Sequence, residues 1–202
     1  SSAETSGGTV ILSPDRPTPE LACGIIETFR PTVFCGVPTM YAGQLQAMAG
    51  KKFDFSSVRL YLSAGEGLPP ELFHRWMKLT GRPPLDGIGS TENLNHFICN
   101  PIDAPRPGSS GKPVPGYAAK IVNEDGDEVP VGDIGQLLIK SESRAARYWR
   151  KPEKTAATFV DGWIRTGDTY YRDEEGYFFC CGRRIRKYMI TSSRIGNRKV
   201  IM

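Results

Sequence analysis

Three glycine-rich loops hold the side chains best suited to chemistry in this 202-residue sequence. They are residues 36–39 (GVPT), 63–67 (SAGEG) and 87–92 (GIGSTE), and each combines glycine with a hydroxyl or carboxylate group. Glycine lets a ligand approach the backbone closely, because it has no Cβ. The loops therefore favour a small-molecule site built from backbone, hydroxyl and carboxylate groups.

Each of these features also has a purely structural interpretation. Ser90, Thr91 and Glu92 form a helix-capping sequence by residue type, and on that basis alone capping is the favoured interpretation. Isolated glycines are ordinary loop formers. Asp168, which follows Gly167, can initiate a turn.

Apolar runs alternate with helical segments through the first half of the chain. The runs lie at residues 9–12, 32–37, 58–62 and 85–88, and the predicted helices at residues 18–29, 39–49 and 70–80. Thr18 and Pro19 suit the start of the first helix, and Gly81 suits the end of the third. This alternation predicts βαβ units and a mainly parallel sheet. Ligands of such sheets bind beyond the carboxyl ends of the strands, where the three loops would lie.

Prolines and glycines crowd residues 105–116 and mark a change in the chain. Beyond them, two hairpins are predicted from residues 117–122 with 136–140 and from residues 170–172 with 177–181, and a short helix at residues 152–159. The predicted fold class is α/β, with a mainly parallel sheet and flanking helices followed by a small antiparallel, barrel-like subdomain. The predicted domains are an α/β subdomain (residues 1–110), a β-rich subdomain (residues 111–182) and a basic tail (residues 183–202).

Composition argues against several classes of protein. No apolar run reaches the roughly 18 residues of a membrane helix and no secretory leader is recognisable, which predicts a cytoplasmic protein without a membrane partner. The five cysteines lack zinc-type spacing and are odd in number, which argues against a disulfide framework and a structural metal. The net charge of +4 arises from the basic stretch after Arg183. That stretch has one aromatic, Tyr188, and no nucleic-acid module, so nucleic acid is not a predicted partner.

Five ordered motifs together carry a resemblance that none carries alone. They are residues 63–69 (SAGEGLP), 86–92 (DGIGSTE), 111–116 (GKPVPG), 163–168 (WIRTGD) and 182–183 (GR). In this order the chain resembles the AMP-forming synthetase and ligase superfamily over about residues 7–183. Residues 86–92, with residues 36–41 (GVPTMY) upstream, are most similar to benzoate-type aryl-CoA ligases.

The resemblance implies an acid–thiol ligase. ATP and an aromatic carboxylate such as a benzoate would form an acyl-adenylate and pyrophosphate, and coenzyme A would then displace AMP. Phosphoryl transfer requires hydroxyls, amides, cations and a metal to neutralise the developing charge. The resemblance makes Thr91 and Glu92 the catalytic residues. Thr91 would hydrogen-bond the α-phosphate, and Glu92 would coordinate Mg²⁺, a hard cation suited to a carboxylate beside phosphates.

The resemblance also implies a nucleotide site. Asp168 would accept hydrogen bonds from the ribose hydroxyls. Arg183 would be its partner near the ribose or, alternatively, one more residue of the basic tail. The other residues predicted to bind the nucleotide, chiefly around the adenine, are Gly65, Glu66, Gly67, Asp86, Gly87, Ile88 and Gly89.

The acyl pocket is expected at the same strand ends. Its predicted residues are Phe34, Cys35, Gly36, Tyr41, Asn93 and His96. The sequence departs from the family here, because benzoate-type relatives usually have tyrosine where Cys35 stands, and His96 is shifted by one position. A smaller Cys35 would enlarge the pocket, or it would only fill core volume. The identity of the acid therefore stays open.

Two parts of the family pattern have no match. The phosphate loop with its lysine would lie upstream, Ile185 stands where the hinge acid is expected, and no C-terminal catalytic lysine is recognisable. We therefore expect little turnover from this chain alone and self-association through exposed sheet surface. Two alternatives stay open: an adenylating enzyme that loads a carrier-protein thiol, and a non-catalytic or vestigial nucleotide-binding protein.

Overall fold

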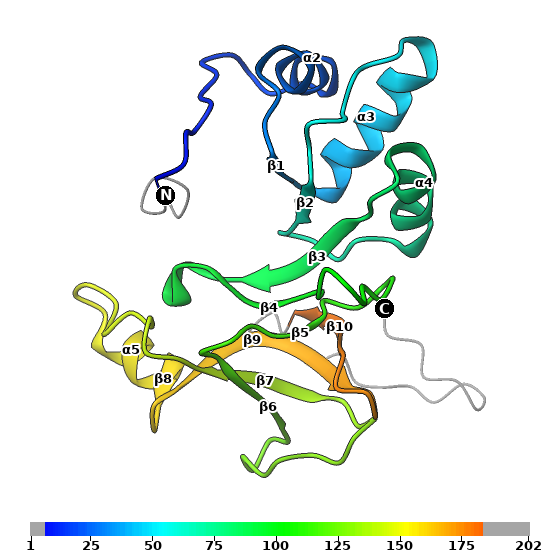
Figure 1. Cartoon of the computed structure of the whole chain (residues 1–202). Helices are drawn as coiled ribbons and strands as arrows, with labels where there is room; N and C mark the ends of the chain where they lie inside the picture. The colour runs from blue at the N-terminus through cyan, green and yellow to red at the C-terminus, as the bar shows by residue number, and fades with distance from the viewer. Residues whose placement is uncertain (1–6, 184–202) are drawn as a thin grey trace, which may run out of the picture.

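The computed structural model describes residues 7–183, which form an α/β part and a second, antiparallel part (Figure 1). The predicted basic tail, apart from Arg183, lies outside the described residues, as do Ile185 and Tyr188. No helix among residues 7–183 has the length and apolar character needed to cross a membrane.

Three helices accompany the first sheet, as the sequence predicts. They are α2 (Pro19–Phe29), α3 (Pro38–Gly50) and α4 (Pro70–Thr80), and each has proline in its first turn. The Thr18 hydroxyl caps α2 by accepting a hydrogen bond from the Leu21 N–H at 3.2 Å. Gly81 ends α4 in the left-handed region, with φ of 75°. Local capping therefore fixes where these helices begin and end.

The first sheet has the strand order β1-β2-β3-β4-β5. Its strands are β1 (Val33–Gly36), β2 (Leu60–Ser63), β3 (Pro84–Gly89), β4 (His96–Cys99) and β5 (Lys112–Pro113). The first three run parallel, whereas β4 and β5 add antiparallel pairs. The sheet is therefore mixed and parallel where the helices cross over, and it extends past residue 110.

The expected strand at residues 9–12 is not formed, which corrects the prediction. This segment forms neither helix nor strand, and Leu12 is 86% exposed. An apolar run becomes a strand only when a neighbour accepts its backbone hydrogen bonds. No described segment pairs with β1 on its side away from β2, so β1 is the edge strand.

A tryptophan organises the core between the sheet and helices α3 and α4. Trp76 is fully buried, and its ring makes edge-on contacts with Tyr41 and Tyr61 at centroid distances of 4.9 and 5.5 Å. Phe55 lies 6.0 Å from the same ring. Such aromatic packing holds both helices on one face of the parallel strands, as Figure 1 shows.

The second sheet has the order β10-β9-β7-β6, with β8 paired to β9. Its elements are β6 (Ala118–Val122), β7 (Gly135–Lys140), β8 (Phe159–Val160), β9 (Trp163–Arg172) and β10 (Phe178–Arg183), with α5 (Pro152–Thr158) before β8. Its main pairs are antiparallel, which confirms both predicted hairpins. Strand β4 supplies Phe97 and Ile98 to the core of this sheet. The two parts are thus packed together through β4.

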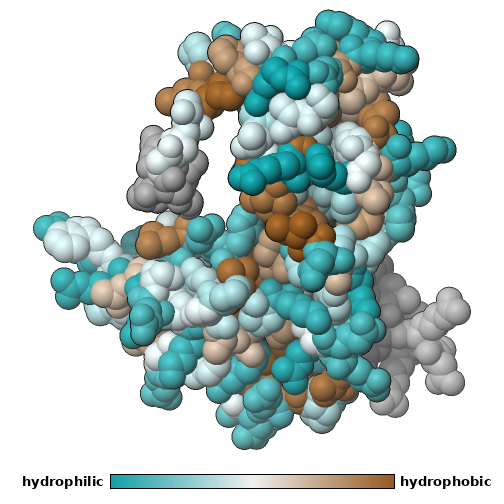
Figure 2. All heavy atoms as spheres, viewed as in Figure 1, coloured by the Kyte–Doolittle hydropathy of each residue, from teal (hydrophilic) through white to brown (hydrophobic). Residues whose placement is uncertain are grey.

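Apolar surface remains on the α/β part of the molecule. Figure 2 shows brown patches on its upper half, in the same view as Figure 1. The exposed apolar side chains here include Phe29, Val33 and Val37, which lie on or beside α2 and β1. An edge strand with apolar neighbours is a surface that other chains can pair with.

Candidate functional site

Three strand ends lie side by side at the predicted loops. Gly36 of β1 is in register with Ser63 of β2, and Ser63 is in register with Asp86 of β3. The Ala64 N–H donates to the Gly36 carbonyl at 3.3 Å and links the first two loops. Gly65 adopts φ of +92°, a conformation that favours glycine. Gly65, Glu66 and Gly67 are exposed, so their backbone is open to a ligand.

Asp86 is the buried carboxyl group in this row. Its side chain is 5% exposed, and its Oδ1 atom has no hydrogen-bond partner. Burial raises the pKa of Asp86 to about 7, although contacts with the backbone N–H groups of Leu68 and Gly87 lower it. Ser63 beside it is also fully buried, with an unpartnered hydroxyl. Ser63 precedes the exposed 65–67 loop in the chain, and Asp86 contacts the backbone of Leu68, which follows that loop.

The glycines of the third loop are explained first by strand packing. A Cβ on Gly87 would stand 2.8 Å from the Ile98 carbonyl oxygen, and one on Gly89 would stand 2.6 Å from that of Asn95. Strand β4 pairs with β3 in antiparallel register here, with an irregularity between Ile88 and Gly89. Ile88 is half-buried against the second core. The nucleotide contacts of Gly87, Ile88 and Gly89 stay a prediction.

A single 3-10 turn, η1 (Thr91–Asn93), follows β3 and presents the predicted catalytic pair. Thr91 is exposed and Glu92 is half-buried. The Tyr148 hydroxyl donates a short hydrogen bond to Glu92 Oε1, and the Ala145 N–H donates to the Glu92 carbonyl at 2.7 Å. Burial alone would raise the pKa of Glu92, but the Tyr148 hydrogen bond, Ser90 and Lys154 lower it overall. Glu92 is therefore ionised at neutral pH.

Asn93 joins this turn to the second part of the molecule. It is fully buried, and its Oδ1 accepts from the Ser141 hydroxyl at 2.7 Å. Its carbonyl accepts from the Ser143 and Tyr117 hydroxyls at 3.3 and 3.4 Å. These three hydroxyls come from residues between β5 and α5, and the predicted approach of Asn93 to the acyl pocket stays a prediction.

Asp168 and Arg183 face each other across the β9–β10 ladder. Arg183 Nε lies 3.4 Å from Asp168 Oδ1, with the arginine side chain 76% exposed and the aspartate side chain 15% exposed. Burial raises the pKa of Asp168, opposed by the Arg183 charge and a hydrogen bond from Thr166. Burial and the hydrogen bond to Glu92 raise the pKa of Tyr148, and the Arg183 charge opposes this rise only in part. The structure thus pairs Tyr148 with Glu92 and Arg183 with Asp168, and the Arg183 charge is felt at Tyr148.

The predicted acyl-pocket residues are only partly brought together. Tyr41 is fully buried, and its hydroxyl donates to the Leu62 carbonyl at 2.7 Å. Its ring contacts Phe34 edge-on at 5.7 Å. Cys35 is exposed and lies on the opposite face of β1 from Phe34 and Gly36, because side chains alternate along a strand.

His96 begins β4 opposite Gly89. Its imidazole is half-buried, and burial lowers its pKa. The ring is therefore neutral at neutral pH. Its Cδ2 atom lies 3.0 Å from where a Cβ on Gly87 would stand, so His96 borders the third loop.

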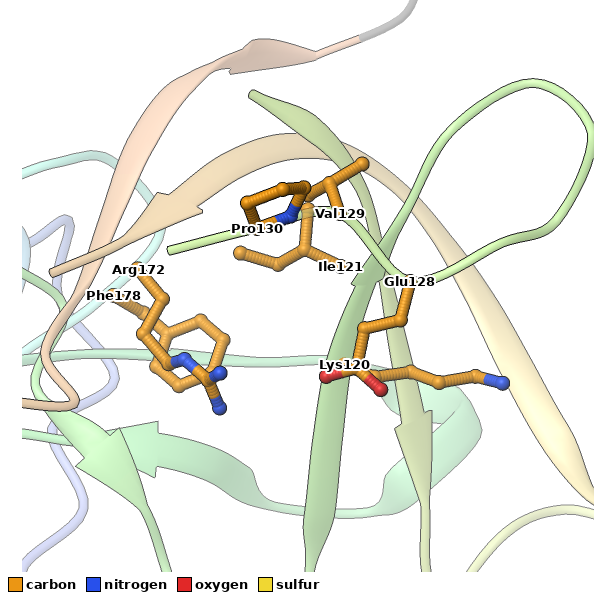
Figure 3. A pocket seen from close by; sticks show the side chains of 7 residues that line it. All are labelled: Lys120, Ile121, Glu128, Val129, Pro130, Arg172 and Phe178. Atoms are coloured by element: carbon orange, nitrogen blue, oxygen red, sulfur yellow. The ribbon is translucent and has the colours of Figure 1, made fainter. Parts of the chain in front are cut away.

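Two hollows lie away from the strand-end loops. An open groove of about 340 Å³ lies between α3 and α4, lined by Phe53, Phe55, Leu79 and Arg82 among others. A cavity of about 10 Å³, barely the size of one water, lies in the second sheet between β6, β9 and β10 (Figure 3). No cluster of three or more metal-ligating side chains occurs within residues 7–183. The loops around Glu92 and Asp168 are therefore the candidate site because of their polar side chains, and not because they line a deep pocket.

Tyr148 and Ser141 are the functional candidates that sequence reasoning missed. Tyr148 reaches Glu92 across 56 residues of sequence, and Ser141 reaches Asn93 across 48. Neither belongs to a motif that the sequence singled out. Contacts this distant depend on how the two sheets pack, which no local pattern reports.

Comparison with known proteins gives a consistent result. Residues 2–149 match the model of a family described as AMP-binding enzyme. A benzoate–CoA ligase from Thauera aromatica is 43% identical over 178 residues, and a 3-hydroxybenzoate–CoA ligase from Aromatoleum sp. (strain CIB) is 42% identical over 178 residues. Both alignments cover 88% of this chain and 34% of the relative, so the chain spans about a third of their length. The crystal structure of the anthranilate CoA ligase AuaEII with anthranoyl-AMP matches with a TM-score of 0.84 and 43% identity, covering 88% of this chain and 34% of that one.

Proposed function

Because this chain belongs to the AMP-binding enzyme family, we propose that it supplies the adenylate-binding region of an AMP-forming acid–thiol ligase. The proposed substrates are an aromatic acid of the benzoate class, ATP and coenzyme A. The names of the similar proteins support this choice, since they are ligases of benzoate and 3-hydroxybenzoate with CoA, and one solved relative holds anthranoyl-AMP.

The observation that carries the proposal is the meeting of two separate sequence regions. Glu92 follows the third parallel strand, whereas Asp168 and Arg183 come from the antiparallel sheet. Tyr148 hydrogen-bonds Glu92, and the Arg183 charge is one influence on the Tyr148 pKa, which supports placing the two regions near each other. Carboxylates, hydroxyls and a cation converge here beside exposed glycine loops, which suits a phosphate and ribose ligand.

In the proposed reaction, a carboxylate oxygen of the acid attacks the α-phosphorus of ATP and the bond to pyrophosphate breaks. The thiol sulfur of coenzyme A then attacks the acyl carbon, and AMP leaves with the bonding electron pair. The exposed Thr91 hydroxyl would donate to the α-phosphate in both steps. Asp168 would accept from the ribose hydroxyls, and Arg183 would keep the carboxylate oriented.

Glu92 fits a magnesium ion that is held mostly by nucleotide phosphates. It is half-buried and ionised, its Oε1 is occupied by Tyr148, and no further acid cluster surrounds it within residues 7–183. Mg²⁺ typically takes one or two carboxylates plus substrate phosphates and water. When bound, the ion would neutralise phosphate charge. Glu92 would be the carboxylate that holds the ion.

The acyl pocket is proposed beside Phe34, Gly36 and His96. Phe34 is half-buried and His96 is kept neutral by burial, so both offer weakly polar surface to an aromatic ring. A Cβ on Gly36 would stand 3.1 Å from atoms of both Phe34 and Tyr41. A larger residue at this position would therefore push against both rings. Tyr41 would act indirectly, because it supports Phe34 from the core.

Calorimetric titration of the 202-residue chain with AMP tests this proposal. Asp168→Ala should weaken AMP binding by about tenfold or more, because it removes charge-assisted hydrogen bonds of roughly 1.5–3 kcal/mol. Thr91→Ala should weaken it by about fivefold, since a neutral hydrogen bond contributes roughly 1 kcal/mol. Asp103→Ala, at an exposed loop aspartate, is the matched control and should bind like the parent. Unchanged AMP affinity in Asp168→Ala would contradict the proposed site.

A further inference from the structure

Tyr148 enters the candidate site from the segment between β7 and α5. Its hydroxyl donates a short hydrogen bond to Glu92 Oε1. Three residues earlier on the same segment, the Ala145 N–H donates to the Glu92 carbonyl at 2.7 Å. Glu92 is therefore held at both its side chain and its backbone by one segment of the second part of the molecule.

Tyr148 is itself fixed in place. Its backbone N–H donates to Thr155 Oγ1 of α5 at 3.1 Å. The Lys154 ammonium lies over its ring, 3.9 Å from the centroid, and the Phe159 ring packs at 5.6 Å. A phenol immobilised by packing and by a helix can orient a neighbour, because little freedom remains to be lost when the hydrogen bond forms.

The next residue of the turn is held from the same side. Asn93 accepts hydrogen bonds from Ser141 at its side chain and from Ser143 at its carbonyl. Residues 141–148 thus hydrogen-bond two consecutive residues of η1, Glu92 and Asn93, whereas Thr91 remains exposed. The turn that carries the predicted catalytic pair is anchored to the second sheet rather than to the parallel strands alone.

We propose that Tyr148 is a positioning residue that fixes the orientation of the Glu92 carboxylate for a cation–phosphate complex by holding its Oε1 atom. This inference rests on the proposed function. The proposed role is selective. The Tyr148 hydroxyl should strengthen binding of a nucleotide accompanied by a divalent cation and have little effect on binding of the nucleotide alone. A hydroxyl that merely supported the fold would affect both equally.

Titration with ATP, in MgCl₂ and separately in EDTA, tests this selectivity. Tyr148→Phe removes only the hydroxyl and keeps the ring that packs against Phe159 and Lys154. It should weaken ATP binding in Mg²⁺ by about tenfold or more, as loss of a residue that orients a metal ligand typically does, and change binding in EDTA by less than about twofold. Tyr177→Phe is the matched control, because the Tyr177 hydroxyl donates to the Ala104 carbonyl instead.

Amide hydrogen exchange of the same variants adds a readout that needs no ligand. Tyr148→Phe should speed exchange at the Ala145 amide, which donates to Glu92, whereas Tyr177→Phe should not. Equal loss of ATP affinity with and without Mg²⁺ would overturn the positioning role. Parent-like exchange at Ala145 would also overturn it. If the parent bound no nucleotide at all, the proposed function would fail, and the exchange result would still decide whether Tyr148 holds Glu92.

Discussion

Asp86 should make the stability of this protein fall as pH rises from acid to neutral. Its carboxyl group is buried within β3, and burial raises its pKa from 3.8 to about 7. A raised pKa means that the folded state binds the proton more tightly than the unfolded state does. Stability from this group is therefore fully present below the unfolded pKa and is lost as pH rises towards the folded pKa of about 7.

The size of the effect follows from the two pKa values. Between pH 5 and pH 8, a shift from 3.8 to about 7 lowers the free energy of unfolding by about 2–3 kcal/mol. Asp86→Asn keeps the shape of the side chain and removes its titration. The difference in unfolding free energy between variant and parent should therefore change by that amount across the range, in favour of the variant at the higher pH.

Urea unfolding at pH 5 and pH 8, followed by tryptophan fluorescence, measures this difference. Asp103→Asn, at an exposed loop position, is the control and should track the parent. Burial lowers the pKa of His96, which makes the free energy of unfolding rise with pH. This contribution is the same in the parent and both variants, so it cancels in the difference. Parallel pH profiles for Asp86→Asn and the parent would refute the reasoning, because Asp86 would then be ionised in the folded protein without penalty.

Three further substitutions test the packing around the site by urea unfolding. Gly111→Ala should destabilise by about 3 kcal/mol or more, since its Cβ would stand 2.1 Å from the backbone of Cys99 at a φ of +97°; a loss under about 1 kcal/mol would count against this close approach. Gly24→Ala, in the middle of α2 with open space around it, should instead stabilise by about 0.5–1 kcal/mol, and a net loss would mean an unrecognised contact. Trp76→Ala should cost about 3–5 kcal/mol, because it empties the centre of the first core; a small loss would show that the core collapses around the gap.

Local signals in the sequence predict much of the α/β part. Proline in the first turn and glycine after the last turn locate α4 to within a residue, because capping depends on neighbours in the chain. Turn residues between apolar runs likewise predict both hairpins of the second sheet. The row formed by Gly36, Ser63 and Asp86 follows from parallel pairing, so the predicted loops do meet.

The remaining features depend on contacts between distant segments. Residues 9–12 have strand composition, but the described chain supplies no partner for them, so they do not form a strand. Strand β4 carries Phe97 and Ile98 into the second core, and its pairing with β3 gives Gly87 and Gly89 a packing role that the sequence does not reveal. No sequence motif points to Tyr148 either, because its hydrogen bond to Glu92 forms only when the two sheets pack together.

The central claim is that the chain binds an acyl-adenylate between its strand-end loops and Asp168. Calorimetric competition between AMP and a non-hydrolysable benzoyl-adenylate mimic tests it most directly, since the mimic contacts both the nucleotide and the acyl site. We expect the mimic to displace AMP and to bind at least about tenfold more tightly, because the benzoyl ring buries additional apolar surface. A folded chain that bound neither ligand would contradict the claim. Binding of AMP with no gain from the benzoyl group would contradict the proposed acid.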